Sequence, residues 1–233
     1  MHLFYSPDLT DNRYELSQED SRHCIRVLRL KKNDLIHLTD GKGSLYKARI
    51  IKDDPKGCMV EVVEKTSEYG KRPYYIHIAI APTKNIKRFE WFLEKCTEIG
   101  IDEITPLICF HSERKHLKTE RSKRIITSAL KQSLKTYHPV LNEITNYNEF
   151  VNKPFEGTKF IAHCESGQNQ HLKHLYSAGE DVTLIIGPEG DFSEKELRKA
   201  ETFNFIPVSL GQSRLRTETA GIVACSIVNL LNE

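Results

Sequence analysis

Short apolar runs alternate with helical segments from residue 74 to the end of the chain, and this alternation limits the fold more than any other feature of the sequence. It is typical of a mostly parallel β-sheet covered by helices, because parallel strands need long crossover connections. Strands are predicted at residues 75–81, 104–109, 160–163, 182–186 and 206–210. We therefore predict an α/β domain over residues 74–233.

Three amphipathic helices are predicted in this domain. The first stops at Gly100, because glycine readily adopts the left-handed conformation that ends helices. Its apolar stripe consists of Phe89, Phe92, Leu93, Cys96 and Ile99. A second helix is predicted over residues 125–137, ended by a proline, and a third runs to residue 231 with Thr217 or Thr219 as its N-cap. Trp91 is assigned to the core.

Residues 1–70 are predicted to form a smaller β-rich domain. Ser17 is a suitable N-cap for a helix through residue 28, and strands are predicted at residues 34–39, 45–51 and 58–63. Gly41 and Gly43 lie between the first two strands, where a hairpin turn needs positive φ angles. The polar segment 64–72 is the predicted linker.

The composition is that of a soluble globular protein of the cytoplasm. The formal net charge is +2, 39% of residues are hydrophobic, and no apolar run is long enough to cross a membrane. The N-terminus lacks the basic and apolar regions of a signal peptide. The six cysteines are scattered singly and are interpreted as reduced thiols: Cys24, Cys58, Cys96, Cys109, Cys164 and Cys225. No metal site, catalytic triad or Walker loop is predicted.

Two glycine-containing segments mark the predicted ligand site. Gly187-Pro188-Glu189-Gly190 follows one predicted strand, and Leu210-Gly211 opens the segment after the next. The carboxyl ends of parallel strands form a binding crevice, and we take the two strands to be neighbours in the sheet. A capping box from Ser193 to Glu196 places a helix N-terminus beside the first loop, and such termini attract anions.

Basic residues gather in two parts of the chain. Residues 84–135 hold 12 Lys and Arg against 7 acidic residues, and a smaller basic cluster lies at residues 22–32. His111 and His116 flank Arg114 just after a predicted strand. This charge fits an RNA backbone, but a solvated helix face would look the same, so charge alone leaves both interpretations open.

Taken together, these motifs resemble the bacterial 16S rRNA uracil-N3 methyltransferases, the RsmE family of the SPOUT superfamily. The resemblance covers nearly the whole chain and is most specific in the two C-terminal segments. Its residues are Gly187-Pro188-Glu189-Gly190, Leu210-Gly211 and Leu215-Arg216-Thr217-Glu218-Thr219-Ala220, supported by His23-x-x-x-Val27-Leu28-Arg29, Lys95-x-x-Glu98-Ile99-Gly100, Ile104-x-Pro106-Leu107, Ser112-Glu113-Arg114 and Gln132-Ser133.

The resemblance implies an S-adenosylmethionine-dependent enzyme with an N-terminal PUA-like β-barrel and a C-terminal trefoil knot in the α/β domain. It further implies a homodimer that methylates 16S rRNA in the small ribosomal subunit or its precursor. The cofactor-binding residues would be His163, Cys164, Glu165, Gly187, Pro188, Glu189, Gly190, Leu210, Gly211, Leu215, Arg216 and Thr217. The RNA-binding residues would be Arg22, Arg26, Arg29, Arg114, Lys131 and Lys135.

Arg216 is the first candidate for stabilising charge on the uracil oxygens, because its fork-shaped guanidinium is permanently protonated. Arg114 is the second. Glu189 and Glu218 are candidates for polar anchoring or proton acceptance. A purely structural role for Arg216 is the alternative. The chain departs from the usual family residues at four positions: Lys131, Lys135, Asp191 and Arg214.

Two other functions compete with this prediction. One is a SPOUT methyltransferase that acts on another RNA base or on a ribose. The other is a non-catalytic RNA-binding protein that has kept the fold. Binding of S-adenosylmethionine would argue against the second, and mapping of the modified nucleoside would decide the first.

Overall fold

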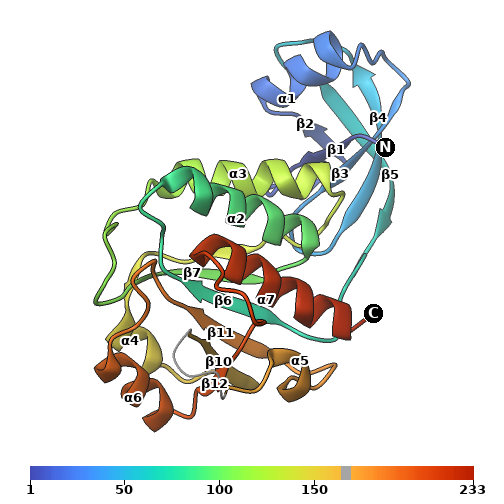
Figure 1. Cartoon of the computed structure of the whole chain (residues 1–233). Helices are drawn as coiled ribbons and strands as arrows, with labels where there is room; N and C mark the ends of the chain where they lie inside the picture. The colour runs from blue at the N-terminus through green and yellow to red at the C-terminus, as the bar shows by residue number, and fades with distance from the viewer. Residues whose placement is uncertain (164–168) are drawn as a thin grey trace. The chain divides into compact units, whose positions relative to one another are not determined.

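The computed structural model describes residues 1–163 and 169–233, which form two compact units (Figure 1). The first unit comprises Met1–Lys71 and Leu130–His138, and the second comprises Arg72–Ala129 and Pro139–Glu233. Residues 130–138, which the sequence analysis places in the second domain, therefore belong to the first unit. Their backbone explains this, because Gly43 N–H donates to Thr136 O at 2.9 Å and His138 N–H donates to Gly41 O at 2.8 Å.

The first unit is built on a five-stranded sheet in the order β1-β3-β4-β5-β2. Its strands are β1 (Leu3–Tyr5), β2 (Arg13–Glu15), β3 (Leu35–Thr39), β4 (Leu45–Lys52) and β5 (Met59–Thr66). The three longer strands and the hairpin turn between β3 and β4 confirm the prediction, with φ angles of 75° at Gly41 and 95° at Gly43. The linker prediction is wrong at its start, because residues 64–66 pair with β4.

The predicted first helix forms, but it changes its winding part-way. Ser17 caps α1 (Gln18–Arg22) by accepting a hydrogen bond from Asp20 N–H at 3.1 Å, which confirms the N-cap. The chain then continues as a π-helical turn over His23–Val27. Arg29 ends the segment in a left-handed conformation, with φ of 58°. The basic residues of this segment are thus presented by an irregular turn.

The second unit contains a sheet of parallel strands in the order β12-β10-β11-β6-β7-β8, with β9 also paired to β7. The strands are β6 (Ile76–Ile80), β7 (Glu103–Ile108), β8 (Val140–Leu141), β9 (Thr145–Asn146), β10 (Thr158–Ala162), β11 (Val182–Ile186) and β12 (Ile206–Val208). All five predicted strands are confirmed. The short strands β8 and β9 carry too few residues to show a period, so the sequence does not reveal them.

Helices cover both faces of this sheet (Figure 1). They are α2 (Ile86–Ile99), α3 (Thr119–Gln132), α4 (Tyr147–Val151), α5 (Leu172–Leu175), α6 (Glu194–Thr202) and α7 (Thr217–Leu231). One face of the sheet is covered by α2, through Phe89 and Phe92, and by α7, through Val228. Tyr147 and Ala200 from α4 and α6 pack on the other face. None of the helices among the described residues is long and apolar enough to span a membrane.

Three helix predictions need correction. The second helix ends at Gln132 and not at residue 137, because Leu134 adopts a φ of 57° and Lys135 N–H bonds back to Leu130 O. The last helix has Arg216 at its N-cap position, without a side-chain bond, in place of a threonine. Trp91 is 46% exposed, because it lies off the buried stripe of α2.

The order of the strands corrects a further prediction, that the two glycine-containing segments follow neighbouring strands. β10 lies between β11 and β12 and pairs with both. Order along the chain does not fix order in the sheet, so periodicity could not reveal this insertion. The end of β10 thereby comes to lie between the two glycine-containing segments.

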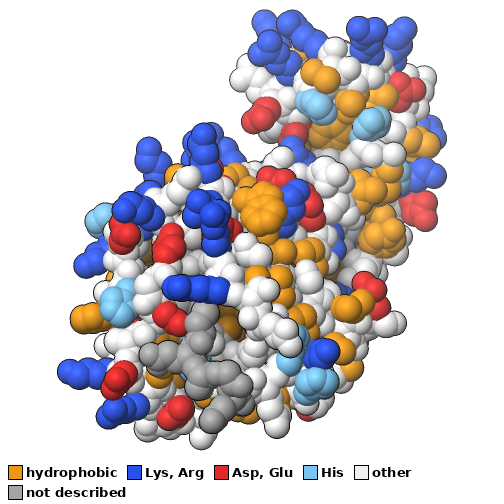
Figure 2. All heavy atoms as spheres, in the orientation of Figure 1, with side chains coloured by type: hydrophobic (Ala, Val, Ile, Leu, Met, Phe, Trp, Pro, Cys, Tyr) orange, Lys and Arg blue, Asp and Glu red, His pale blue; other side chains and the backbone are white. Residues whose placement is uncertain are grey.

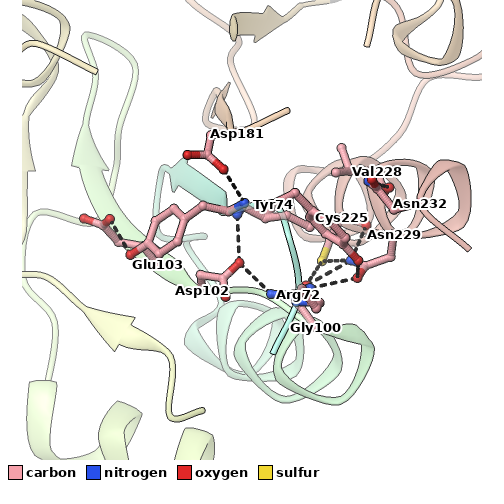
Figure 3. Close-up of polar contacts among 12 residues, drawn as sticks. Arg72, Tyr74, Gly100, Asp102, Glu103, Asp181, Cys225, Val228, Asn229 and Asn232 are labelled. Carbon is pink, nitrogen blue, oxygen red and sulfur yellow. Dashed lines mark hydrogen bonds and ion pairs between the residues drawn. The ribbon is translucent and has the colours of Figure 1, made fainter. Parts of the chain in front are cut away.

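A half-buried polar network closes the second unit around Arg72 (Figure 3). The Arg72 guanidinium donates to Gly100 O at 2.7 Å, to Asn229 Oδ1 at 2.9 Å and to Asp102 Oδ2 at 2.5 Å. Asn229 Nδ2 also donates to Gly100 O, at 2.9 Å. The carbonyl at the end of α2, which no helix turn can satisfy, thus gains two donors. The start of the unit is tied to α2 and α7.

Candidate functional site

Two adjoining cavities lie at the carboxyl ends of β10, β11 and β12. The larger has a volume of about 840 Å³ and the smaller about 230 Å³. They share six lining residues: Ala162, His163, Asp191, Arg214, Leu215 and Ala220. Volumes of several hundred Å³ are typical of small-molecule sites, and open α/β sheets bind ligands at this edge.

Most of the predicted cofactor-binding residues line these cavities. The smaller cavity is lined by His163, Gly187, Pro188, Glu189, Leu215, Arg216 and Thr217, and the larger one by His163, Leu210, Gly211 and Leu215. Gly190 lines neither of them. Cys164 and Glu165 fall outside the described residues. The two glycine-containing segments therefore meet at one site, although their strands are not neighbours.

The glycines of this site serve different purposes. Gly211 has a φ of 139°, and an added Cβ would meet no atom within 4 Å, so its backbone faces open space beside the larger cavity. A Cβ on Gly190 would lie 2.9 Å from Cβ of His111, so the lack of a side chain at Gly190 allows the loop after β7 to pack against it. A Cβ on Gly187 would lie 3.0 Å from the Phe192 ring. Of these three glycines, Gly211 is the one whose Cβ direction is open.

Glu189 and Arg114 are held by the loop that joins β6 to α2. Glu189 Oε1 accepts the Lys84 N–H at 2.9 Å. Arg114 Nε donates to Thr83 O at 3.0 Å, and its Nη2 donates to Lys84 O at 2.7 Å. Neither cavity is lined by Arg114. These contacts hold both side chains against the loop that joins β6 to α2.

Arg216 and Glu218 stand at the start of α7 in different surroundings. Arg216 is exposed and lines the smaller cavity. Glu218 is only 5% exposed; its Oε1 lies 3.8 Å from Arg88 Nε, and its Oε2 finds no hydrogen-bond partner among the described residues. A buried carboxylate oxygen without a partner is costly and points to a missing ligand or proton. The sequence placed Arg88 in a basic segment but did not indicate its contact with Glu218.

Four polar residues from α5 and from the segment before it also line the larger cavity, and sequence reasoning missed all of them. They are Asn169, His171, Lys173 and His174. His163 contacts Asn169 at 3.1 Å through Nε2, and its buried Nδ1 has no partner among the described residues. Burial lowers the pKa of His171, with a smaller effect from Lys173 and His174.

The predicted RNA-binding residues of the first unit differ in their availability. Arg22, Arg26 and Arg29 are all exposed. Lys131 forms an ion pair with Asp20, with Nζ 3.1 Å from Oδ1. Lys135 is half-buried in the segment after α3. The arginines thus keep their charge at the surface, whereas that of Lys131 is partly neutralised.

In the second unit, Lys and Arg side chains gather over α2 and α3 (Figure 2). Some are already paired, as Arg121 is with Glu90 and Lys95 with Glu98. Exposed cations remain near the site in the loop after β7, among them Lys115 and Lys118. The positive charge over α2 and α3 therefore comes from a few exposed residues, because ion pairs neutralise others.

Comparison with known proteins identifies the family. A model of the RNA methyltransferase domain matches residues 70–229, and one of the RNA methyltransferase PUA domain matches residues 16–63. Ribosomal RNA small subunit methyltransferase E of Aquifex aeolicus is 31% identical, over 99% of both chains. The chain belongs to this family. It is thus an RNA methyltransferase with a PUA domain, as the motifs led us to expect.

Solved structures of related proteins share the whole fold. A probable rRNA methyltransferase from Porphyromonas gingivalis is 42% identical with a TM-score of 0.93, over 100% of this chain and 98% of that one. A Legionella pneumophila methyltransferase, solved with bound S-adenosylmethionine, is 31% identical with a TM-score of 0.88, over 99% of this chain and 97% of that one.

Proposed function

We propose that this protein transfers the methyl group of S-adenosylmethionine to N3 of a uridine in 16S rRNA of the small ribosomal subunit or its precursor. The observation that carries the proposal is the pair of cavities at the ends of β10, β11 and β12, lined by both glycine-containing segments and by Arg216. The family supports rRNA methylation, and the bound cofactor of the Legionella relative supports the methyl donor.

The residues present fit the cofactor. Gly211 leaves open space for a ligand beside the larger cavity, and His163 Nδ1 is a buried polar atom in need of a partner. Backbone at Gly187, Leu210 and Leu215 would hold the remainder of the molecule. When bound, the sulfonium supplies an electrophilic methyl group, so the chain itself must bind, orient and balance charge.

Arg216 is assigned to stabilise the charge that develops on the uracil, and Glu218 to accept the N3 proton. Attack by N3 requires loss of the imide proton, and the negative charge then spreads over the uracil oxygens. Arg216, which lines the smaller cavity, would stabilise that charge. Glu218 would accept the proton, because its Oε2 is buried without a hydrogen-bond partner among the described residues, although Glu218 itself lines neither cavity.

Several finer features complete the proposal. A trefoil knot in the C-terminal part is consistent with the insertion of β10 between β11 and β12 and with the SPOUT resemblance. A homodimer is favoured because α2 and α7 leave Trp91 46% exposed and Leu230 68% exposed. The exposed arginines of the PUA domain, Arg22, Arg26 and Arg29, would contact RNA phosphates, as would Lys131 and Lys135. An enzyme that acts on ribosomal RNA would work in the bacterial cytoplasm.

The test is to incubate the protein with S-adenosylmethionine and 16S rRNA or small subunits from cells that lack the modification, and to map the product by mass spectrometry. We expect 3-methyluridine at one position. A methyl group on another base or on a ribose would overturn the proposed target. RNA binding without methyl transfer would instead support a non-catalytic RNA-binding protein.

A further inference from the structure

Phe110 is the most exposed large apolar side chain among the described residues, with 75% of its surface accessible. It follows β7 directly, at the carboxyl edge of the sheet where the candidate site lies. Exposure of a large apolar ring to water is unfavourable, but a single exposed phenylalanine is not unusual on a protein surface. The contacts around Phe110 distinguish it from an ordinary exposed residue.

The backbone on both sides of Phe110 is firmly held. Phe110 N–H donates to Oε1 of the buried Glu196 at 2.8 Å, while the other oxygen of Glu196 accepts from Ser193 at the N-cap of α6. Cys109 N–H donates to Ser112 Oγ at 2.9 Å. The loop therefore holds the ring in solvent by its own hydrogen bonds, so the ring does not depend on loop movement to become exposed.

The ring also lies next to the candidate site. His111 Nδ1–H donates to Asp191 O at 3.0 Å, and Asp191 lines both cavities. The rings of Phe110 and His111 meet edge to face, with centroids 4.9 Å apart. His111, the residue after Phe110, thus directly contacts the loop that carries Gly187 and Glu189.

The surrounding charge suits an anionic partner. Residues 109–118 contain three cations, Arg114, Lys115 and Lys118, and one acid. That acid, Glu113, is paired with Lys84 at 2.8 Å. An exposed aromatic ring among cations is the arrangement by which proteins hold single-stranded nucleic acid, since the ring stacks on a base and the cations meet phosphates.

We propose that Phe110 is a stacking platform for a base next to the target uridine, with Lys115 on the adjoining phosphate. The proposal rests on the proposed function for the identity of the RNA. Stacking of a neighbouring base would help to keep the target nucleotide unstacked and directed into the smaller cavity. A protein partner at the same place, including a second copy of this chain, is the competing occupant.

The test measures RNA binding separately from methylation. The probe is a short, fluorescein-labelled single-stranded RNA containing uridine, titrated by anisotropy into wild-type protein, Phe110→Ala, Phe110→Leu and Phe110→Trp. We expect Ala and Leu to raise Kd by roughly 5- to 150-fold, because base–aromatic stacking is worth about 1–3 kcal/mol per base. Phe110→Trp should restore binding, and Ile206→Ala, another exposed apolar position, is the control.

Salt dependence separates the two contacts. Phe110→Ala should leave the slope of log K against log salt unchanged, whereas Lys115→Ala should reduce that slope by about one. Calorimetry should show unaltered S-adenosylmethionine affinity in both variants.

Two results would overturn the platform. One is full affinity in Phe110→Leu, which would show that an apolar side chain suffices without an aromatic face. The other is a lower sedimentation coefficient of Phe110→Ala, which would assign the ring to contact between subunits. Because the titration needs no methyl transfer, a wild-type protein that binds RNA but does not methylate it would refute the proposed function and leave this test intact.

Discussion

Replacement of Gly211 by valine should weaken S-adenosylmethionine binding more than it weakens folding. Gly211 has a φ of 139°, a conformation that costs other residues about 1–3 kcal/mol, and an added Cβ meets no neighbour that would raise this cost. The side chain would instead fill space beside the larger cavity. We expect cofactor affinity to fall at least about tenfold, or ~1.4 kcal/mol, in addition to the folding cost.

Gly179→Val provides the matched control. Gly179 has a φ of 84° and also leaves its Cβ direction open, but it lines neither cavity. The backbone penalty should therefore be similar, and cofactor affinity should stay at the wild-type value.

The two effects are measured by thermal unfolding without ligand and by calorimetric titration with S-adenosylmethionine. Each kcal/mol should lower Tm by about 2–4 °C for a chain of this size. The reasoning fails if folded Gly211→Val binds the cofactor as tightly as wild type, or if Gly179→Val loses affinity equally. In either case the open space at Gly211 would not belong to the ligand.

Three further variants probe the chemistry, the RNA contact and the core. Arg216→Ala should lower the single-turnover methylation rate at saturating RNA and cofactor, by about 10²- to 10³-fold if Arg216 stabilises the developing charge; an unchanged rate would refute that role. Arg26→Ala/Arg29→Ala should weaken RNA binding and flatten its salt dependence, and an unaltered slope in a filter-binding assay would remove both residues from the phosphate contact. Burial lowers the pKa of His77 to about 4, so between pH 6.5 and 4 the unfolded chain binds a proton that the folded chain does not. The free energy of unfolding should therefore fall by up to ~3 kcal/mol as the pH drops through this window, and His77→Gln should remove that part of the loss in urea titrations; parallel pH profiles would contradict the assignment.

Local chemistry explains which features could be predicted from sequence. Ser17 and Ser193 cap helices because a side-chain oxygen at the N-cap satisfies a free N–H within a few residues. Gly100 ends α2 with a φ of 130°, which the end of the apolar stripe had indicated. Five strands of the second unit were recognisable because each contains a short apolar run between polar segments. These predictions depend on residues close together in the chain.

The features that could not be predicted depend on contacts between distant residues. Thr136 joins the first unit through a hydrogen bond to Gly43, and periodicity carries no record of that pairing. Trp91 faces outward because other residues of α2 fill the buried stripe. The residues lining the larger cavity from α5, such as His171, became visible only once β10 was seen between β11 and β12. Hydrophobicity alone cannot supply that order.

The contacts of Arg72 bear on how the enzyme matures during translation. Arg72 and its amide partner Asn229 are separated by 157 positions, so a ribosome must add most of the methyltransferase domain before the bond can form. Until then the guanidinium lacks that partner. Helix α2 also lacks its neighbour α7, whose Gly221 packs against the Phe92 ring. Contacts so distant in sequence close slowly, because loop entropy must be lost first. The PUA domain should accordingly acquire its strands early, while the catalytic site remains unassembled in the nascent chain until α7 has emerged.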